Sequence, residues 1–201
     1  MDREKVIDFY KLTKKQTQLI DFYLEKLIKT NKNFNLVGSS TLKCPWDRHV
    51  NDSLQLSKFI KNKDSRIVDF GTGAGIPGLL LNIYGHKNII LIDSKSKKIQ
   101  FINNFISEFQ ISAKTICKRV DAIKNIKSDY IICRALSPLI NLLNYSLFFS
   151  KTNTTLLFLK GRNVNTEILH AKKNFDFYYK LFESKSQGDG FVLKINKLVK
   201  L

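Results

Sequence analysis

The sequence contains little cysteine and no long apolar run, and each shortage excludes a class of protein. The three cysteines, Cys44, Cys117 and Cys133, are widely spaced and odd in number. Neither a disulfide framework nor a zinc site built on paired cysteines is therefore expected. We predict reduced thiols, a cytoplasmic location and no bound metal. No apolar stretch approaches the roughly 20 residues that a membrane-spanning helix needs, and the N-terminus leads into no signal-peptide core.

Acidic residues and arginine are also scarce. Lysine and arginine together number 34 against 17 acidic residues, which gives a formal charge of +17. Such an excess favours a polyanionic partner, with nucleic acid the first candidate. Because 28 of the basic residues are lysine and asparagine is abundant, the composition also fits the bias of an AT-rich genome. The charge alone is thus weak evidence for RNA binding. The six arginines are better candidates, since their planar fork suits phosphate, carboxylate or base recognition.

The chain of 201 residues, 43% of them hydrophobic, suits one domain with a small appendage. It has no internal repeat, low-complexity segment or linker. Apolar residues recur at helical spacing over residues 4–30, and Ser39, Ser40 or Thr41 is placed to cap a further helix that runs to about Ile60. We therefore predict a helical N-terminal extension, residues 1–62, packed on a core formed by residues 63–201.

Strand and helix patterns alternate after this extension. The predicted strands are Arg66–Phe70, Asn88–Asp93, Lys114–Cys117, Tyr130–Arg134, Thr155–Lys160, Phe175–Leu181 and Phe191–Asn196. Helical patterns cover Ile76–Tyr84, Lys95–Phe109, Pro138–Phe149 and Val164–Lys173. This alternation predicts an α/β fold with a seven-stranded, mostly parallel sheet. The last two strands are separated only by residues 184–190, too few for a crossover helix, so we expect a C-terminal antiparallel hairpin.

A glycine-dense turn follows the first predicted strand, in the segment Ile67–Gly78. Four glycines within eight residues allow a tight turn and let a ligand approach unshielded main-chain amides. The next strand ends in Asp93, whose carboxylate can accept hydrogen bonds from ribose hydroxyls. The two features together predict a cofactor that contains a nucleoside.

The glycine pattern alone does not distinguish a dinucleotide from S-adenosylmethionine, since it also matches the G-x-G-x-x-G fingerprint. Three features favour S-adenosylmethionine. Asp69 opens the run Asp-Phe-Gly-Thr-Gly-Ala-Gly, which is typical of methyltransferases. The sheet is predicted to end in a hairpin, as in Rossmann-like class I methyltransferases. Too few residues remain for the substrate domain of a dehydrogenase.

A series of motifs in one order narrows the interpretation further. The series comprises Arg48-His49-Val50-Asn51-Asp52-Ser53-Leu54, the loop Asp69–Gly78, Leu91-Ile92-Asp93-Ser94, Cys133-Arg134-Ala135-Leu136 and Phe158-Leu159-Lys160-Gly161. Over roughly residues 30–165 it resembles the RsmG (GidB) family of 16S ribosomal RNA guanine-N7 methyltransferases. The resemblance implies methylation of a guanine N7 in small-subunit RNA, with S-adenosyl-L-methionine as cofactor.

The same resemblance implies a set of site residues. The cofactor-binding set is Asp69, Gly71, Gly73, Gly75, Ile76, Asp93, Val120, Asp121 and Arg134. The substrate-binding set is Arg48, His49, Ser53 and Lys160, and the catalytic set is Arg134, Lys160 and His49. Plainer roles stay open: Asp121 as a helix cap, Lys160 as one more exposed lysine, His49 as a structural residue, and Arg48 with Asp52 as a surface ion pair.

Guanine N7 carries a lone pair and no proton, so its methylation requires no general base. In agreement, the sequence lacks the Asn/Asp-Pro-Pro-Tyr/Phe motif used for exocyclic amines. We expect a monomer that acts on 16S RNA, the small subunit or an assembly intermediate. The alternatives are a methyltransferase for a different acceptor, a nicotinamide-dependent oxidoreductase, and a non-catalytic RNA-binding protein associated with the ribosome.

Overall fold

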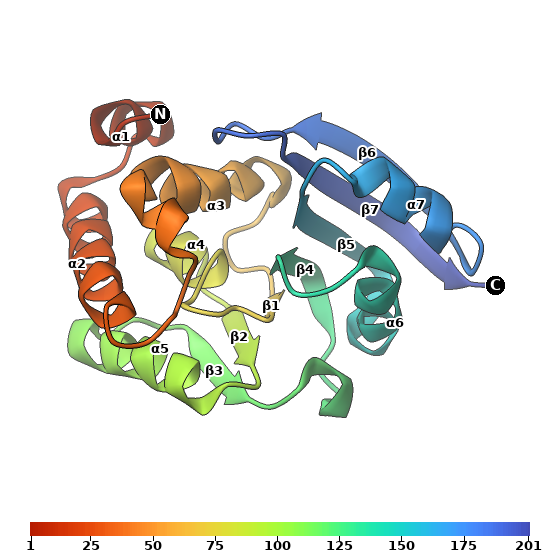
Figure 1. Ribbon diagram of the computed structural model, residues 1–201. Helices are drawn as coiled ribbons and strands as arrows, with labels where there is room; N and C mark the ends of the chain where they lie inside the picture. Colours follow the sequence, from red (N-terminus) through yellow and green to blue (C-terminus); the bar gives the residue numbers. More distant parts are fainter.

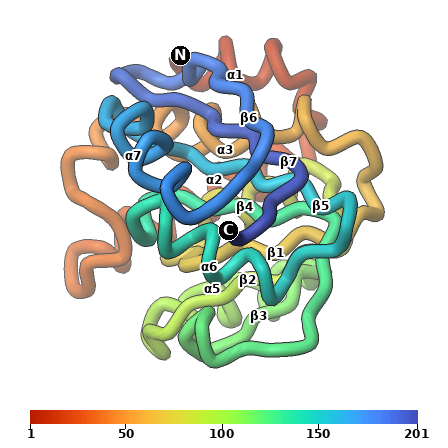
Figure 2. The backbone as a smooth tube through the Cα atoms, turned by 90° about the vertical axis from the view of Figure 1, so that its right-hand side faces the viewer, coloured from red at the N-terminus to blue at the C-terminus, as the bar shows by residue number.

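A computed structural model describes residues 1–201, and its centre is a seven-stranded sheet. The strands are β1 Ile67–Phe70, β2 Ile89–Asp93, β3 Lys114–Cys117, β4 Ser128–Arg134, β5 Ser150–Lys160, β6 Phe175–Glu183 and β7 Phe191–Lys200. Their order is β3-β2-β1-β4-β5-β7-β6, visible from bottom to top in Figure 2. The first five are parallel, and β7 is antiparallel to both β5 and β6. The predicted sheet and its terminal hairpin are confirmed.

Helices cover both faces of the sheet (Figure 1). They are α1 Arg3–Tyr10, α2 Lys14–Asn31, α3 Asp52–Leu54, α4 Gly78–Ile83, α5 Ser96–Phe109, α6 Leu139–Phe149 and α7 Val164–Ala171. The N-terminal helices, α4 and α5 share one apolar core, whereas α6 and α7 pack into a second core on the opposite face. None of these helices is both long and apolar enough to cross a membrane.

The N-terminal region departs from the prediction in two places. The periodic stretch 4–30 forms two helices, because Lys11 adopts a left-handed conformation and Thr13 starts α2 with a capping box. The prediction of a single further helix that runs to about Ile60 is wrong. That segment consists of short pieces: a 3₁₀ turn Ser39–Lys43, a π-helical turn Trp46–Asn51 (η2), α3, and a 3₁₀ turn Gln55–Phe59 (η3). Pro45, which lacks an amide hydrogen, precedes the π turn.

Residues 1–62 and the sheet share a single apolar core. Ile20, Leu24 and Leu27 of α2 are buried in the same cluster as Ile67 of β1 and Leu79 of α4. Burial of these side chains, worth about 1.5–3 kcal/mol each, holds the N-terminal helices against the sheet. The division into an extension and a core stays a prediction. Arg48 of the following segment contacts Arg134 at the carboxyl end of β4.

Candidate active site

The glycine loop joins β1 to α4. Some of its glycines leave open space beside the backbone, and others permit close packing. Gly71, Gly73 and Gly75 have φ angles of 64°, 60° and 97°, in the left-handed region that favours glycine. A Cβ placed on Gly73 would meet nothing nearer than Lys98 Nζ at 3.9 Å. A Cβ on Gly78 would lie 2.7 Å from Asp69 Oδ2 and closer still to Leu91. Gly78 thus permits close helix–strand packing, while Gly73 leaves open space beside the backbone.

Asp69 supports this loop from beneath. Its side chain is fully buried, and Oδ2 accepts hydrogen bonds from Thr72 Oγ1 at 2.6 Å and from the Gly78 amide at 2.8 Å. Oδ1 has no partner. Burial raises the pKa of Asp69 to about 7, against the lowering effect of the two hydrogen bonds. Asp69 therefore fixes the loop, and any influence of Asp69 on the predicted cofactor passes through the loop backbone.

Asp93 stands at the end of β2, where the sequence predicted a ribose-binding carboxylate. Oδ2 accepts from the Gly73 amide at 2.9 Å and Oδ1 from the Lys95 amide at 2.8 Å. These two bonds fix the carboxylate beside the glycine loop. Each oxygen keeps lone-pair capacity for a further donor.

Two adjoining cavities form a cleft at the carboxyl ends of the parallel strands, where open α/β sheets bind ligands. The first, of about 220 Å³, is lined by Gly71, Asp93, Ser94, Lys118, Arg119, Val120, Asp121, Leu136, Ser137 and Tyr145. The second, of about 190 Å³, is lined by Leu36, Val37, Gly38, Thr41, Gly71, Thr72, Gly73, Ala74, Ile76, Lys98, Arg134 and Ala135. Gly71 belongs to both. The structure thus brings seven predicted cofactor residues to one cleft: Gly71, Gly73, Ile76, Asp93, Val120, Asp121 and Arg134.

Asp121 lies in the short 3₁₀ turn Val120–Ala122, on the wall of the first cavity. Its carboxylate pairs with Arg119, at 3.1 Å from Nε and 2.7 Å from Nη2. This hydrogen-bonded pair holds the pKa of Asp121 below its usual range. Asp121 is therefore an anionic acceptor at the far end of the cleft from Arg134.

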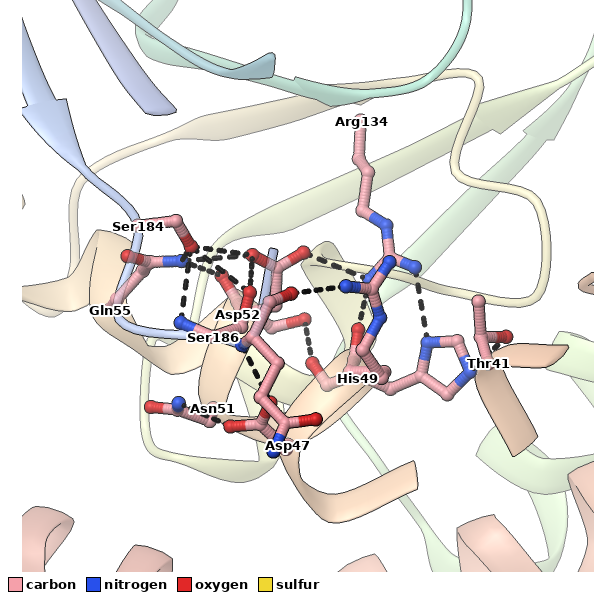
Figure 3. A network of polar contacts seen from close by, with 12 residues as sticks. Thr41, Asp47, His49, Asn51, Asp52, Gln55, Arg134, Ser184 and Ser186 are labelled. Atoms are coloured by element: carbon pink, nitrogen blue, oxygen red, sulfur yellow. Dashed lines mark hydrogen bonds and ion pairs between the residues drawn. The ribbon is translucent and has the colours of Figure 1, made fainter. Parts of the chain in front are cut away.

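Arg134, the last residue of β4, is fixed by three partners (Figure 3). Nη1 donates to the carbonyl oxygen of Arg48 at 2.8 Å and lies 3.1 Å from Asp52 Oδ2. Nη2 lies 3.2 Å from Nδ1 of His49. The arginine side chain lines both the second cavity of the cleft and a third, more polar cavity. Arg134 is the only residue that these two cavities share.

His49 is completely buried and orients Arg134. Nε2 of His49 lies 3.0 Å from Thr41 Oγ1, and that hydroxyl donates to the Gly38 carbonyl at 2.6 Å. The hydroxyl proton is thus used, so we assign the imidazole proton to Nε2 and leave Nδ1 free to accept from Arg134. Burial, with Arg134 and Arg48 nearby, lowers the pKa of His49 to about 3. The imidazole is therefore neutral at physiological pH, as this bond requires.

Asp52 makes a different contact from the one the sequence suggested. It pairs with Arg134 rather than with Arg48. Its Oδ1 accepts from Gln55 Nε2 at 2.9 Å and from Ser186 Oγ at 3.0 Å. Burial raises the pKa of Asp52, and Arg134 and the hydroxyls of Ser186 and Ser184 oppose that shift. The carboxylate connects the arginine to the loop between β6 and β7, whose Ser184 also lies 3.3 Å from Oδ1.

The third cavity, of about 310 Å³, has four basic and two acidic residues in its lining. It is lined by Arg48, Asp52, Arg134, Leu159, Lys160, Gly161, Arg162, Ser184, Ser186, Gln187, Gly188, Asp189, Gly190 and Phe191. Three of the six arginines of the chain therefore meet at this one cavity. Lys160 Nζ lies 2.7 Å from Glu167 Oε2 and donates to the Ser137 carbonyl at 3.3 Å. Arginine forks and lysine around a polar cavity suit the phosphates and base edges of RNA.

The loop 184–190 completes this cavity because residues of the π turn hold it. Asn51 Nδ2 donates to the Lys185 carbonyl at 2.8 Å, and the Gln187 amide donates to Asp47 Oδ2 at 2.8 Å. Arg48 also donates to the Gln187 carbonyl. Sequence reasoning assigned this loop no role beyond a turn. The contacts join residues 134 to 140 positions apart, which no local pattern reveals.

Two predicted substrate residues, His49 and Ser53, line none of these three cavities. Both are fully buried, and Ser53 Oγ donates to the His49 carbonyl at 2.6 Å. Their roles in binding stay predictions, and the geometry makes them supports for Arg134. Sequence reasoning did not find Thr41, Lys98 or Asp52 as site residues. It counted Arg162 among the scarce arginines, and that scarcity was the available signal.

Comparison with known proteins identifies the family. The model of the GidB family, rRNA small subunit methyltransferase G, matches residues 16–188. Ribosomal RNA small subunit methyltransferase G of Rickettsia prowazekii (strain Madrid E) is 35% identical over 182 residues, covering 90% of this chain and 94% of that protein. Among solved structures, an MtNAS mutant in complex with S-adenosylmethionine gives a TM-score of 0.62 at 13% identity, covering 98% of this chain and 84% of that chain. Ribosomal protein L11 methylase from Lactobacillus delbrueckii subsp. bulgaricus gives 0.60 at 16% identity, covering 73% and 76%.

The two structural likenesses confirm the Rossmann-like methyltransferase fold. The family match covers the chain from α2 to the loop between β6 and β7, and the relative covers 90% of the chain. The glycine loop, Asp93, Arg134 and Lys160 all lie inside the matched region. This chain belongs to the family of rRNA small subunit methyltransferase G.

Proposed function

We propose that this protein transfers a methyl group from S-adenosyl-L-methionine to N7 of a guanine in 16S ribosomal RNA. The observation that carries the proposal is the position of Arg134, between the glycine-loop cleft and the basic third cavity. One side chain can thus contact both a cofactor in the cleft and an RNA base in the third cavity. We place the activity in the cytoplasm and expect a monomer.

The residues of the cleft fit this cofactor. Gly73 leaves open space beside the backbone for the methionine part, and Lys98, which lines the same cavity, would pair with its carboxylate. Asp93 would accept from the ribose hydroxyls, and Val120 with Asp121 would contact the adenine. When bound, the cofactor supplies an electrophilic methyl group on a sulfonium.

The chemistry asks for alignment rather than for proton transfer. The N7 lone pair forms the new bond to the methyl carbon as the carbon–sulfur bond breaks, and no proton leaves the acceptor. The site agrees: His49 is buried, neutral and engaged with Arg134, so it offers no general base. Arg134, Lys160 and Arg48 would hold the guanine edge and its phosphate, and correct orientation is the main source of rate enhancement in such a site.

Methyl-transfer assays test this proposal. Small-subunit RNA and particles are prepared from cells that lack the gene, incubated with the protein and radiolabelled S-adenosylmethionine, and digested for nucleoside mapping. We expect label in N7-methylguanosine at one site. Label in another nucleoside or in protein would refute the acceptor, and cofactor binding without transfer would favour a non-catalytic RNA-binding role. Absence of cofactor binding would refute the proposal as a whole.

A further inference from the structure

The sheet presents a basic face at its β6 edge. Phe182 of β6 packs against Phe59 of η3, with ring centroids 4.8 Å apart. Side chains two apart along a strand share a face, so Lys180 and Tyr178 lie on the same side as Phe182. In the register of the hairpin, Lys180 is directly opposite Lys194. We call the residues Lys58, Lys180, Lys194, Lys197 and Tyr178 the hairpin face.

Four of the five residues of the hairpin face are exposed, and Lys194 is half-buried. Helices α6 and α7 pack on the other side of the sheet, in the core that contains Phe177 and Ile195. On the near side Phe59 packs against Phe182 of β6. Beyond it Tyr178 is 68% exposed, and Lys180 is exposed as well. A large aromatic ring therefore stands beside lysines on an uncovered sheet surface.

The four lysines of the hairpin face have no acidic partner within the chain. None of its four lysines forms an ion pair, although Lys172 of the same region pairs with Asp176 at 3.2 Å. Like charges directly opposite on antiparallel strands are destabilising. A lysine-rich composition supplies such residues, but it does not place two of them in register next to an exposed tyrosine. The arrangement is complementary to an external anion.

Aromatic rings accompany the lysines along this surface. Lys58 Nζ lies 4.6 Å from the ring centroid of Phe59 and 5.1 Å from that of Phe182. Lys197 Nζ lies 5.1 Å from the ring centroid of Tyr178. Basic side chains beside an exposed ring suit single-stranded nucleic acid, because phosphates bind the cations and a base stacks on the ring.

We propose that the hairpin face is a second RNA-binding surface, which receives the RNA strand that continues from the third cavity. This inference rests on the proposed function. The cavity is formed by Phe191, where β7 begins, and by the loop that follows β6. Lys180 lies three residues before Glu183, the end of β6, which is about 10 Å along the strand. RNA bound in the cavity thus reaches the hairpin face within a few nucleotides.

Charge variants separate this role from a structural one. Lys180→Gln with Lys194→Gln should raise the KM for RNA several-fold and lower the slope of log K against log salt by up to about two, near 0.9 for each phosphate that is no longer neutralised. The kcat at saturating RNA and the affinity for S-adenosylmethionine should not change. The matched control is Lys124→Gln with Lys127→Gln, two exposed lysines without an ion pair that precede β4, three strands away from β6 in the sheet.

Lys180→Glu sharpens the test, because it places opposite charges across the strands. We expect an unchanged or higher Tm together with a still higher KM, a combination that unfolding cannot produce. If wild type methylates RNA and the hairpin variants match the control in KM and salt slope, the inference is refuted while the proposed function stands. Failure of wild type to bind or methylate RNA would refute both.

Discussion

The guanidinium of Arg134 lies 3.1 Å from the carboxylate of Asp52, and both side chains are more than four-fifths buried. Asp52 in turn accepts from Ser186 of the loop between β6 and β7. The position of Arg134 therefore depends on the Asp52 carboxylate, which the loop between β6 and β7 holds in place through Ser186. The partly buried ion pair also costs desolvation, so its value lies in orientation more than in stability.

Replacing Asp52 by asparagine should keep most hydrogen bonds and remove the charge opposite Arg134. We expect kcat for RNA methylation to fall about tenfold or more, which corresponds to at least about 1.4 kcal/mol of barrier. The affinity for S-adenosylmethionine in calorimetry should change less. Asp129→Asn is the control, because it breaks an exposed pair with Lys151 of 2.7 Å and should cost under about 1 kcal/mol of stability. Wild-type kcat in Asp52→Asn would contradict this role.

The sheet was predictable because its signals are local. The strand that ends in Asp93 is an unbroken apolar run, and four glycines mark the turn after Phe70. The support of Arg134 was not predictable. It depends on a π-helical turn that directs His49 inward and on a loop held by Asn51 from 134 positions away. Neither the irregular turn nor the long-range pairing leaves a periodic pattern in the sequence.

His49 should make stability depend on pH in a defined window. Its pKa is about 3 in the folded protein, below the ordinary value of 6.5. Below pH 6.5 the unfolded chain therefore binds the extra proton, and the free energy of unfolding falls as the pH drops from 6.5 toward 3. His49→Gln can accept from Arg134 and does not titrate, so its stability should fall less over this window. Denaturant unfolding at pH 4.5, 5.5 and 7.5 measures the difference.

Asp69 contributes to the pH dependence of stability with the opposite sign. Because wild type and His49→Gln both contain Asp69, its contribution cancels in the difference between them. The pKa of Asp69 is raised to about 7, so the stability it provides is full below pH 3.8 and is lost as the pH rises through 7. Parallel curves for wild type and His49→Gln would show that His49 does not titrate as described. At pH 7.5 the glutamine variant should keep its methylation rate within a few-fold, whereas His49→Ala should lose it.

Two glycine substitutions should separate binding from packing. Gly73→Asp adds a side chain where the protein offers open space, so it should abolish measurable binding of S-adenosylmethionine. Its cost in stability, from the φ angle of 60°, should be only about 1–2 kcal/mol. Gly78→Ala drives a methyl group against Leu91 and Asp69, and should destabilise by about 1–3 kcal/mol. Calorimetry and thermal unfolding measure both, and retained cofactor affinity in Gly73→Asp would exclude the loop as the binding site.

Lys160 poses the sharpest choice between a structural and a functional role. Its partner Glu167 also accepts from the Leu139 amide at 2.6 Å, at the start of α6.

If the lysine serves only this ion pair, Lys160→Gln should lose about as much stability as Glu167→Gln. The double variant should then be more stable than the sum of the two losses predicts, and it should methylate at the wild-type rate. If Lys160 contacts RNA, methylation should fall in both the single and the double variant. We expect the second result, because the lysine lines the third cavity beside Arg134. A double-mutant cycle, with stability and kcat/KM as separate readouts, distinguishes the two roles. If Lys160 serves only the ion pair, the two substitutions should be coupled in both quantities. If Lys160 contacts RNA, they should be coupled only in stability.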